Sequence, residues 1–200
     1  ERFWTSSWRR SSYETVGGAN LVSLPDSFEL EAKVDRGQFV PLEETHKLVD
    51  CLIGDIRRAG IRLNASSRLN SYAALLTSGD DYSSVDCDYA LLEVLQLLAI
   101  VRELSKSPPV AGWDSAVERA LKGAVRALED RIDSVARSTQ AELWTAAVLR
   151  ARGYSVELSE PDLSITAPDG SRLQVAVKRP RSPKKVRRNA HEAAKQLARR

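Results

Sequence analysis

Three side chains in the C-terminal third of the chain could act together on a phosphate ester. Glu142 and Asp162 supply carboxylates, and Lys178 supplies an ammonium group. Carboxylate oxygens are ligands that Mg²⁺ prefers, and a fixed ammonium group stabilises charge that develops on a phosphate. Each residue also has a structural explanation: Glu142 could cap a helix, Asp162 could begin a turn, and Lys178 could start a solvated run of charges. The chemistry requires a fold that brings the three together.

A block of basic residues begins at Lys178. Residues 178–200 contain ten Lys or Arg and one acid, Glu192, so this block carries +9 and the rest of the chain −6. Such an asymmetry favours a polyanionic partner, although a solvated tail has the same composition. The bases expected to contact the phosphates of a nucleic acid are Arg179, Arg181, Lys184, Lys185, Arg187 and Arg188. No aromatic RNA-binding pattern is present, which favours DNA over RNA.

Five short elements must position these groups. A cap at Ser138 or Thr139, with Glu142 at capping-box spacing from Thr139, predicts a helix that ends at Gly153. Alternating apolar residues predict three strands, and residues 168–170 (Pro-Asp-Gly) predict a hairpin turn between the last two. In order, the predicted elements are helix 138–153, strands 154–158, 163–166 and 173–177, and helix 188–200.

The third predicted strand determines where Lys178 points. Side chains alternate along a strand, so positions 174, 176 and 178 share one face, while Leu173, Val175 and Val177 face the core. This alternation places Lys178 on the face of the proposed site.

This order of elements, with these residues in it, resembles the PD-(D/E)xK nuclease superfamily, which has the restriction-endonuclease-like fold. The literal Pro161-Asp162 begins the second strand, and residues 175–180 (Val-Ala-Val-Lys-Arg-Pro) are similar to the family's third-strand motif. Glu142 occupies the helix position at which many members carry a glutamate, and Gln196 matches a glutamine of the last helix. The resemblance covers residues 138–200. The whole set of motif residues, on elements in this order, is more specific than a Pro-Asp pair followed by a single lysine.

The resemblance implies a metal-dependent nuclease that hydrolyses DNA phosphodiester bonds with Mg²⁺ or Mn²⁺. Asp162 would be a direct metal ligand, Glu142 would stand at the metal, and Lys178 would orient the attacking water or stabilise the developing charge. Gln196 would join the nucleic-acid-binding residues. The family pattern also continues into a fourth strand, which does not follow within the 200 residues.

The sequence departs from the family at position 176, where the second acid of the motif is replaced by Ala176. Loss of one catalytic group typically costs about 10²–10⁴-fold in rate. Three explanations stay open. The alanine could be an introduced change, Glu192 of the following helix could replace the missing ligand, or the chain could be a natural nuclease-like protein that binds nucleic acid without cutting it.

The preceding residues predict a separate helical region. Residues 1–42 form an irregular segment with short strands expected at 28–34 and 38–42, whereas residues 43–136 have a helical period that predicts a bundle. The predicted helices are 43–60, 65–77, 85–105 and 114–134, the last capped by Asp114. With a nuclease-like core at 137–200, the fold class is α+β, a mainly helical region followed by an α-β-β-β-α core.

Composition narrows the remaining choices. No apolar run is long enough for a spanning helix, and Cys51 and Cys87 form no CxxC pair, which disfavours a disulfide scaffold or a zinc site. The Arg- and Ala-rich composition favours a reducing, bacterial cytoplasmic location. The chain starts at Glu1 without any methionine, so a removed leader stays open. A prokaryotic defence role would suit the family analogy. A third hypothesis makes the helical region a dimerisation or interaction module, through a stripe of Leu91, Leu95, Leu98 and Val101.

Overall fold

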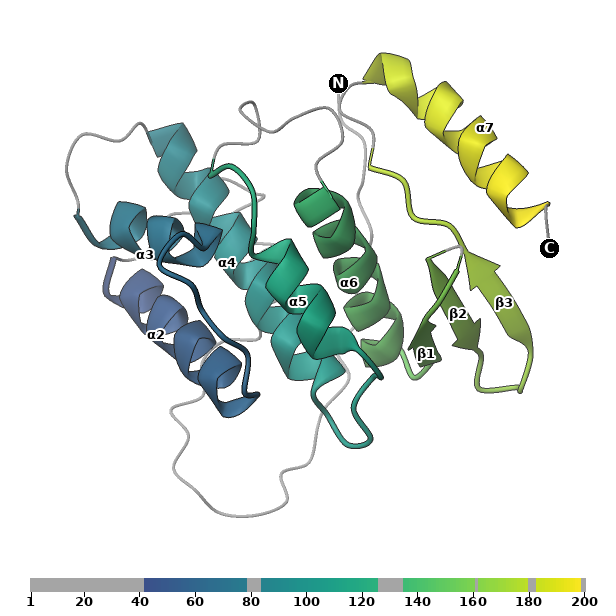
Figure 1. Ribbon diagram of the computed structural model, residues 1–200, viewed down its shortest axis with the longest axis horizontal. Coiled ribbons are helices and arrows are strands. Elements are labelled where there is room, and N and C mark those ends of the chain that lie inside the picture. The colour runs from purple at the N-terminus through teal and green to yellow at the C-terminus, as the bar shows by residue number, and fades with distance from the viewer. Residues whose placement is uncertain (1–41, 79–83, 126–134, 161, 180–182, 199–200) are drawn as a thin grey trace.

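The described part of the chain has an α+β architecture. A computed structural model describes residues 42–78, 84–125, 135–160, 162–179 and 183–198 (Figure 1). Within these ranges lie six α-helices and one three-stranded antiparallel sheet. The strands expected at 28–34 and 38–42 lie outside the described residues, except for Leu42, which begins a helix. No helix in these ranges has both the length and the apolar character needed to cross a bilayer.

Four helices form the bundle, and the first three follow the predicted ranges closely. They are α2 (Leu42–Arg58), α3 (Arg68–Ser78), α4 (Ser84–Leu104) and α5 (Trp113–Ala120). Helix α4 is central, because it packs against α2, α3 and the later helix α6. The stripe of Leu91, Leu95, Leu98 and Val101 is buried in this core. A dimer formed by the bundle would therefore need a different surface.

Helix α5 differs from its prediction at both ends. It stops at Ala120 instead of continuing toward residue 134, and the residues from 126 onward in that predicted helix lie outside the described ranges. Gly123 has a φ of 100°, which a continuing helix does not allow. The N-cap residue is Gly112, in the left-handed region, whereas Asp114 lies in the first turn, so the predicted Asp114 cap is wrong.

Helix α6 (Val135–Ala151) lies between the bundle and the sheet (Figure 1) and packs against α4, α5 and the first strand. It begins before the predicted cap, so Thr139 is a buried residue inside the helix and the predicted capping box with Glu142 is wrong. The helix ends as predicted before Gly153, which has a φ of 86°.

The sheet has the order β1-β2-β3, with strands β1 (Ser155–Leu158), β2 (Leu163–Thr166) and β3 (Arg172–Val175). Buried side chains of β1 and β2 join α6 in one core. The predicted turn is confirmed: the Gly170 N–H donates to the Ala167 carbonyl at 2.9 Å. Strand β3 ends two residues before its predicted end, because β2 begins at Leu163, the partner of Val175.

The far edge of the sheet and the last helix are exposed. Leu173 of β3 was predicted to face the core, yet its side chain is 54% exposed, because the edge strand extends beyond the cover of α6. A 3₁₀ turn, η1 (Pro183–Lys185), leads into α7 (Val186–Leu197), which begins two residues earlier than predicted and has no buried residue. The basic residues of this helix are therefore open to solvent.

Candidate active site

Asp162 is the centre of the candidate site. It lies directly before β2, and its half-buried carboxylate accepts two hydrogen bonds through Oδ2. The backbone N–H of Val177 donates at 2.6 Å, and the ammonium group of Lys178 donates at 3.3 Å. The Val177 N–H would otherwise need a partner beyond the end of β3. Asp162 therefore ties the start of β2 to the segment that carries Lys178.

Glu142, on helix α6, is partly buried and lies within electrostatic reach of Asp162 and Lys178. Burial raises the pKa of the Glu142 carboxyl, the neighbouring Asp162 carboxylate raises that pKa further, and the positive charge of Lys178 lowers it. These interactions mean that the two carboxylates and the ammonium group lie within electrostatic reach of one another. The structure thus shows direct contact between Asp162 and Lys178 and an electrostatic influence of both on Glu142; the roles of the three residues stay predictions.

The residues at this site include fewer acids than the family motif. Position 176 carries alanine in the segment just after β3, and no group of three or more His, Cys, Asp or Glu that could hold a metal ion occurs among the described residues. Two carboxylates are nevertheless compatible with Mg²⁺, which commonly binds one or two carboxylates, substrate phosphate oxygens and several waters. Glu142 and Asp162 fit this reduced set, in which the substrate would complete the coordination.

The raised pKa of Glu142 predicts an effect on stability. Above the ordinary pKa of 4.5 the folded protein must hold an unfavourable charge at Glu142, so Glu142→Gln is expected to raise the melting temperature near pH 7. Below that pKa the side chain is protonated in both states, and the gain should disappear. Thermal melts at both pH values, with the exposed Glu157→Gln as control, measure this effect. A lower melting temperature at neutral pH would contradict it.

The predicted nucleic-acid-binding residues lie on the segment after Lys178 and on α7. The exposed ones are Arg179, Lys184, Lys185, Arg187 and Arg188. Arg181 lies outside the described residues, and Gln196 is half-buried on α7. Glu192, the candidate replacement ligand, pairs with Arg188 at 2.8 Å. Arg188 lowers the pKa of Glu192, and Lys178 adds a smaller effect in the same direction.

Sequence reasoning missed a buried ionic cluster inside the bundle. Arg68, Glu93 and Arg137 are 1%, 7% and 2% exposed. Glu93 accepts from Arg137 at 2.6 Å and from Arg68 at 3.4 Å, so one carboxylate serves two guanidinium groups. The signal in the sequence is Glu93 itself, a charge in the most apolar stretch of the chain. A buried acid requires a buried partner, but the sequence does not say which one.

Tyr89 connects this cluster to the candidate site. Its hydroxyl accepts from Arg137 Nη1 at 2.7 Å. Burial raises the pKa of Tyr89 to about 12, with further increases from Glu93, whereas Arg137 and Arg179 lower it. Arg179, which follows Lys178 directly, therefore lies within electrostatic reach of Tyr89 on α4.

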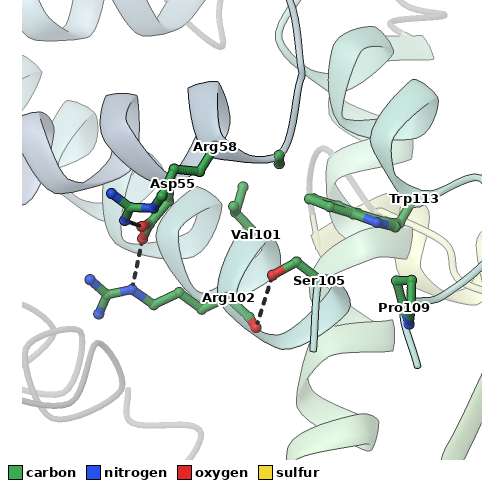
Figure 2. Close-up of a pocket in the computed structure, with 8 residues that line it drawn as sticks. Asp55, Arg58, Val101, Arg102, Ser105, Pro109 and Trp113 are labelled. Atoms are coloured by element: carbon green, nitrogen blue, oxygen red, sulfur yellow. Dashed lines mark hydrogen bonds and ion pairs between the residues drawn. The ribbon is translucent and has the colours of Figure 1, made fainter. Parts of the chain in front are cut away.

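A surface pocket of about 440 Å³ lies elsewhere in the bundle, between α2, α4 and the start of α5 (Figure 2). Figure 2 shows Asp55 and Arg102 at one side and Trp113 at the other. Asp55 accepts from both Arg58 and Arg102. The charged groups of this pocket are paired with one another, and its lining includes Val101 of the apolar stripe but none of the predicted catalytic, metal-binding or nucleic-acid-binding residues.

Comparison of the chain with known protein families, curated proteins and solved structures finds no match. The candidate site therefore stands on its own geometry and on the motif resemblance described above.

Proposed function

We propose that this chain is a nuclease-like module of the PD-(D/E)xK type that acts on DNA with a divalent cation. The observation that supports it most is that Asp162, just before β2, pairs with Lys178, in the segment after β3, and that both act electrostatically on Glu142 of α6, up to 36 residues away in the sequence. A structural ion pair between Asp162 and Lys178 does not account for Glu142, whose half-buried charge is unfavourable without a cation.

Each residue has a distinct role in this proposal. Glu142 and Asp162 would hold Mg²⁺ or Mn²⁺, which when bound would neutralise charge on the phosphate and lower the pKa of a water. Lys178, already 3.3 Å from Asp162 Oδ2, would orient the attacking water or stabilise the developing negative charge. The Val177 N–H fixes the Asp162 carboxylate, so that the charged groups are aligned before substrate binds.

The exposed basic residues would hold the DNA backbone. Lys184 and Lys185 lie on η1, and Arg187 and Arg188 lie in the first turn of α7. Cations on a solvent-exposed helix can contact phosphates without reading base sequence. The site and these bases share the segment that begins at Lys178, so bound DNA would pass beside the carboxylates.

A second candidate function, DNA binding without cleavage, is favoured by a specific observation. Ala176 removes the second acid of the motif, and Lys178 donates to the carboxylate oxygen that a cation would use. In this reading the ion pair replaces the metal, and the basic surface alone remains functional. Cytoplasmic location and homodimer formation likewise remain proposals.

Metal binding separates the two functions. We expect Mg²⁺ or Mn²⁺ to bind the unmodified chain in titration calorimetry, because two carboxylates meet there, and expect the heat to vanish in the double variant Glu142→Gln and Asp162→Asn. Glu157→Gln, an exposed acid of β1, is the matched control and should bind as before. If the unmodified chain binds neither cation, DNA binding without cleavage is the function that remains.

DNA affinity should depend steeply on salt under either function. About six phosphate contacts predict a loss of roughly 10³-fold between 50 and 200 mM salt. Replacing Lys184 and Lys185 by alanine should reduce the slope of log affinity against log salt by about two, at roughly 0.9 for each contact. Lys122→Ala, an exposed lysine after α5, should leave the slope unchanged. Fluorescence anisotropy with a labelled duplex measures this slope.

A further inference from the structure

Helix α6 packs through small alanines as well as larger side chains, since Trp144 and Leu149 are partly buried against the core. Its buried apolar residues are three alanines and Leu143, and the bundle covers one side while the sheet covers the other. Small alanine side chains interlock weakly with neighbouring helices, so a rotated helix would bury a similar surface. The helix nevertheless has to present Glu142 toward Asp162. Directional polar contacts would fix its rotation more firmly than this packing alone.

Two polar side chains of α6 supply that interaction. Arg137 and Gln140 are three residues apart, hence on one face of the helix, and both are buried. Glu142 is two residues beyond Gln140 and therefore lies on nearly the opposite side. Any rotation of α6 that broke the contacts of the first face would also turn Glu142 away from Asp162.

The contacts of Arg137 are directional. Its Nη1 donates to Glu93 at 2.6 Å and to the Tyr89 hydroxyl at 2.7 Å, while its Nη2 donates to the carbonyls of Val125 at 2.8 Å and Ala124 at 3.1 Å. A planar guanidinium group with several partners tolerates little displacement. These partners come from α4 and from the segment after α5.

Gln140 links the same face to two more groups. It accepts from Arg68 Nη2 at 2.7 Å and donates to Gln96 at 3.2 Å. Arg68 also donates to the Ala120 carbonyl at the C-terminal end of α5. The end of a helix is favourable for a cation, which helps to explain how two buried guanidinium groups share one carboxylate.

We infer that Arg68, Glu93, Arg137 and Gln140 form a register lock, a buried network that sets the rotation of α6 and thereby directs Glu142 toward Asp162. Arg137 and Gln140 are positioning residues, because they lie on the face of α6 away from Glu142. The role of Glu142 as a metal ligand in this inference rests on the proposed function. The effect of the lock on the rotation of α6 does not.

The rotation can be followed at Trp144, two residues after Glu142 on the same helix and partly buried against the core. With ¹⁹F-labelled tryptophan, Trp144→Phe identifies the Trp144 resonance, which should be single in the unmodified chain. Arg137→Met leaves Glu93 paired with Arg68 and should shift or split this resonance. Gln140→Leu should do the same, and Gln140→Glu, which retains the acceptor for Arg68, should restore the original signal at least in part.

Leu52→Ala is the matched control, because Leu52 is a fully buried apolar residue of α2 and is not one of the four residues of the lock. This variant should lower stability and leave the Trp144 resonance single and unshifted. If Arg137→Met fails to fold, Gln140→Leu decides the question. An unshifted, single resonance in folded Gln140→Leu would overturn the inference.

Function provides a separate readout. In a variant that cleaves DNA, Gln140→Leu should lower the cleavage rate by roughly 10²-fold, as displacement of a group by about 1 Å can do, with unchanged DNA affinity. An altered Trp144 resonance without any cleavage in the parent variant would support the lock and reject the nuclease function. Failure of the register lock and failure of the nuclease function are therefore distinguishable.

Discussion

Ala176→Glu is expected to raise metal-dependent DNA cleavage by about 10²–10⁴-fold over the unmodified chain. Position 176 lies between Val175, which ends β3, and Val177, whose N–H holds Asp162. A glutamate there would add a third carboxylate to Glu142 and Asp162 and would compete with Asp162 for the ammonium group of Lys178. Both changes favour a bound cation. Conversion of supercoiled plasmid in Mg²⁺ or Mn²⁺ measures the rate.

Three controls make this result specific. Ala176→Gln has nearly the same shape as Ala176→Glu without the charge and should stay at the level of the unmodified chain. Asp162→Ala and Lys178→Ala, each combined with Ala176→Glu, should abolish the gain. If Ala176→Glu binds DNA normally and still releases no product with either cation, the nuclease function is wrong and DNA binding alone remains.

Glu93→Gln is expected to destabilise the protein by about 3–5 kcal/mol, a large part of the 5–15 kcal/mol that holds a typical domain folded. The substitution retains the shape of the side chain but removes the carboxylate that pairs with both Arg68 and Arg137. Both buried guanidinium groups would then lose the charge of Glu93, and their carbonyl partners on α5 and the following segment compensate only partly. Urea denaturation followed by circular dichroism measures the loss.

Glu103→Gln on the same helix is the matched control. Glu103 pairs with Lys106, whose side chain is 58% exposed, so water replaces much of that interaction. The expected loss is about 0.2–1 kcal/mol. Similar losses of unfolding free energy from the two substitutions would show that the buried cluster stabilises the protein no more than an exposed ion pair does.

Much of the local structure is predictable from the sequence. The ranges of α2 and α4, the order helix, three strands and helix, and the turn ending at Gly170 all follow from apolar periodicity and from glycine at positive φ. Asp162 and Lys178 were also identifiable, because a strand places alternate residues on one face. These features depend on residues that are neighbours in the chain, and their physical causes act over a few residues.

The errors occur where distant segments interact. Helix α5 ends early at Ala120. There the Arg68 side chain donates a hydrogen bond to the Ala120 carbonyl, and the Arg68 backbone N–H donates to the Leu121 carbonyl at 2.9 Å. The periodicity of the predicted helix contains no sign of this contact. Likewise, Thr139 has the right spacing for a cap but lies inside α6, because the helix extends back to Val135.

By itself, the sequence determined which groups are available for chemistry: two carboxylates, one lysine, a basic block and an alanine at the position of the missing acid. Only the tertiary structure decided that Glu142 approaches Asp162 and that Arg137 and Arg68 share Glu93. The physical reason is that side-chain types and short-range periodicity are properties of neighbouring residues. Which charges meet depends instead on how α6 packs between the bundle and the sheet.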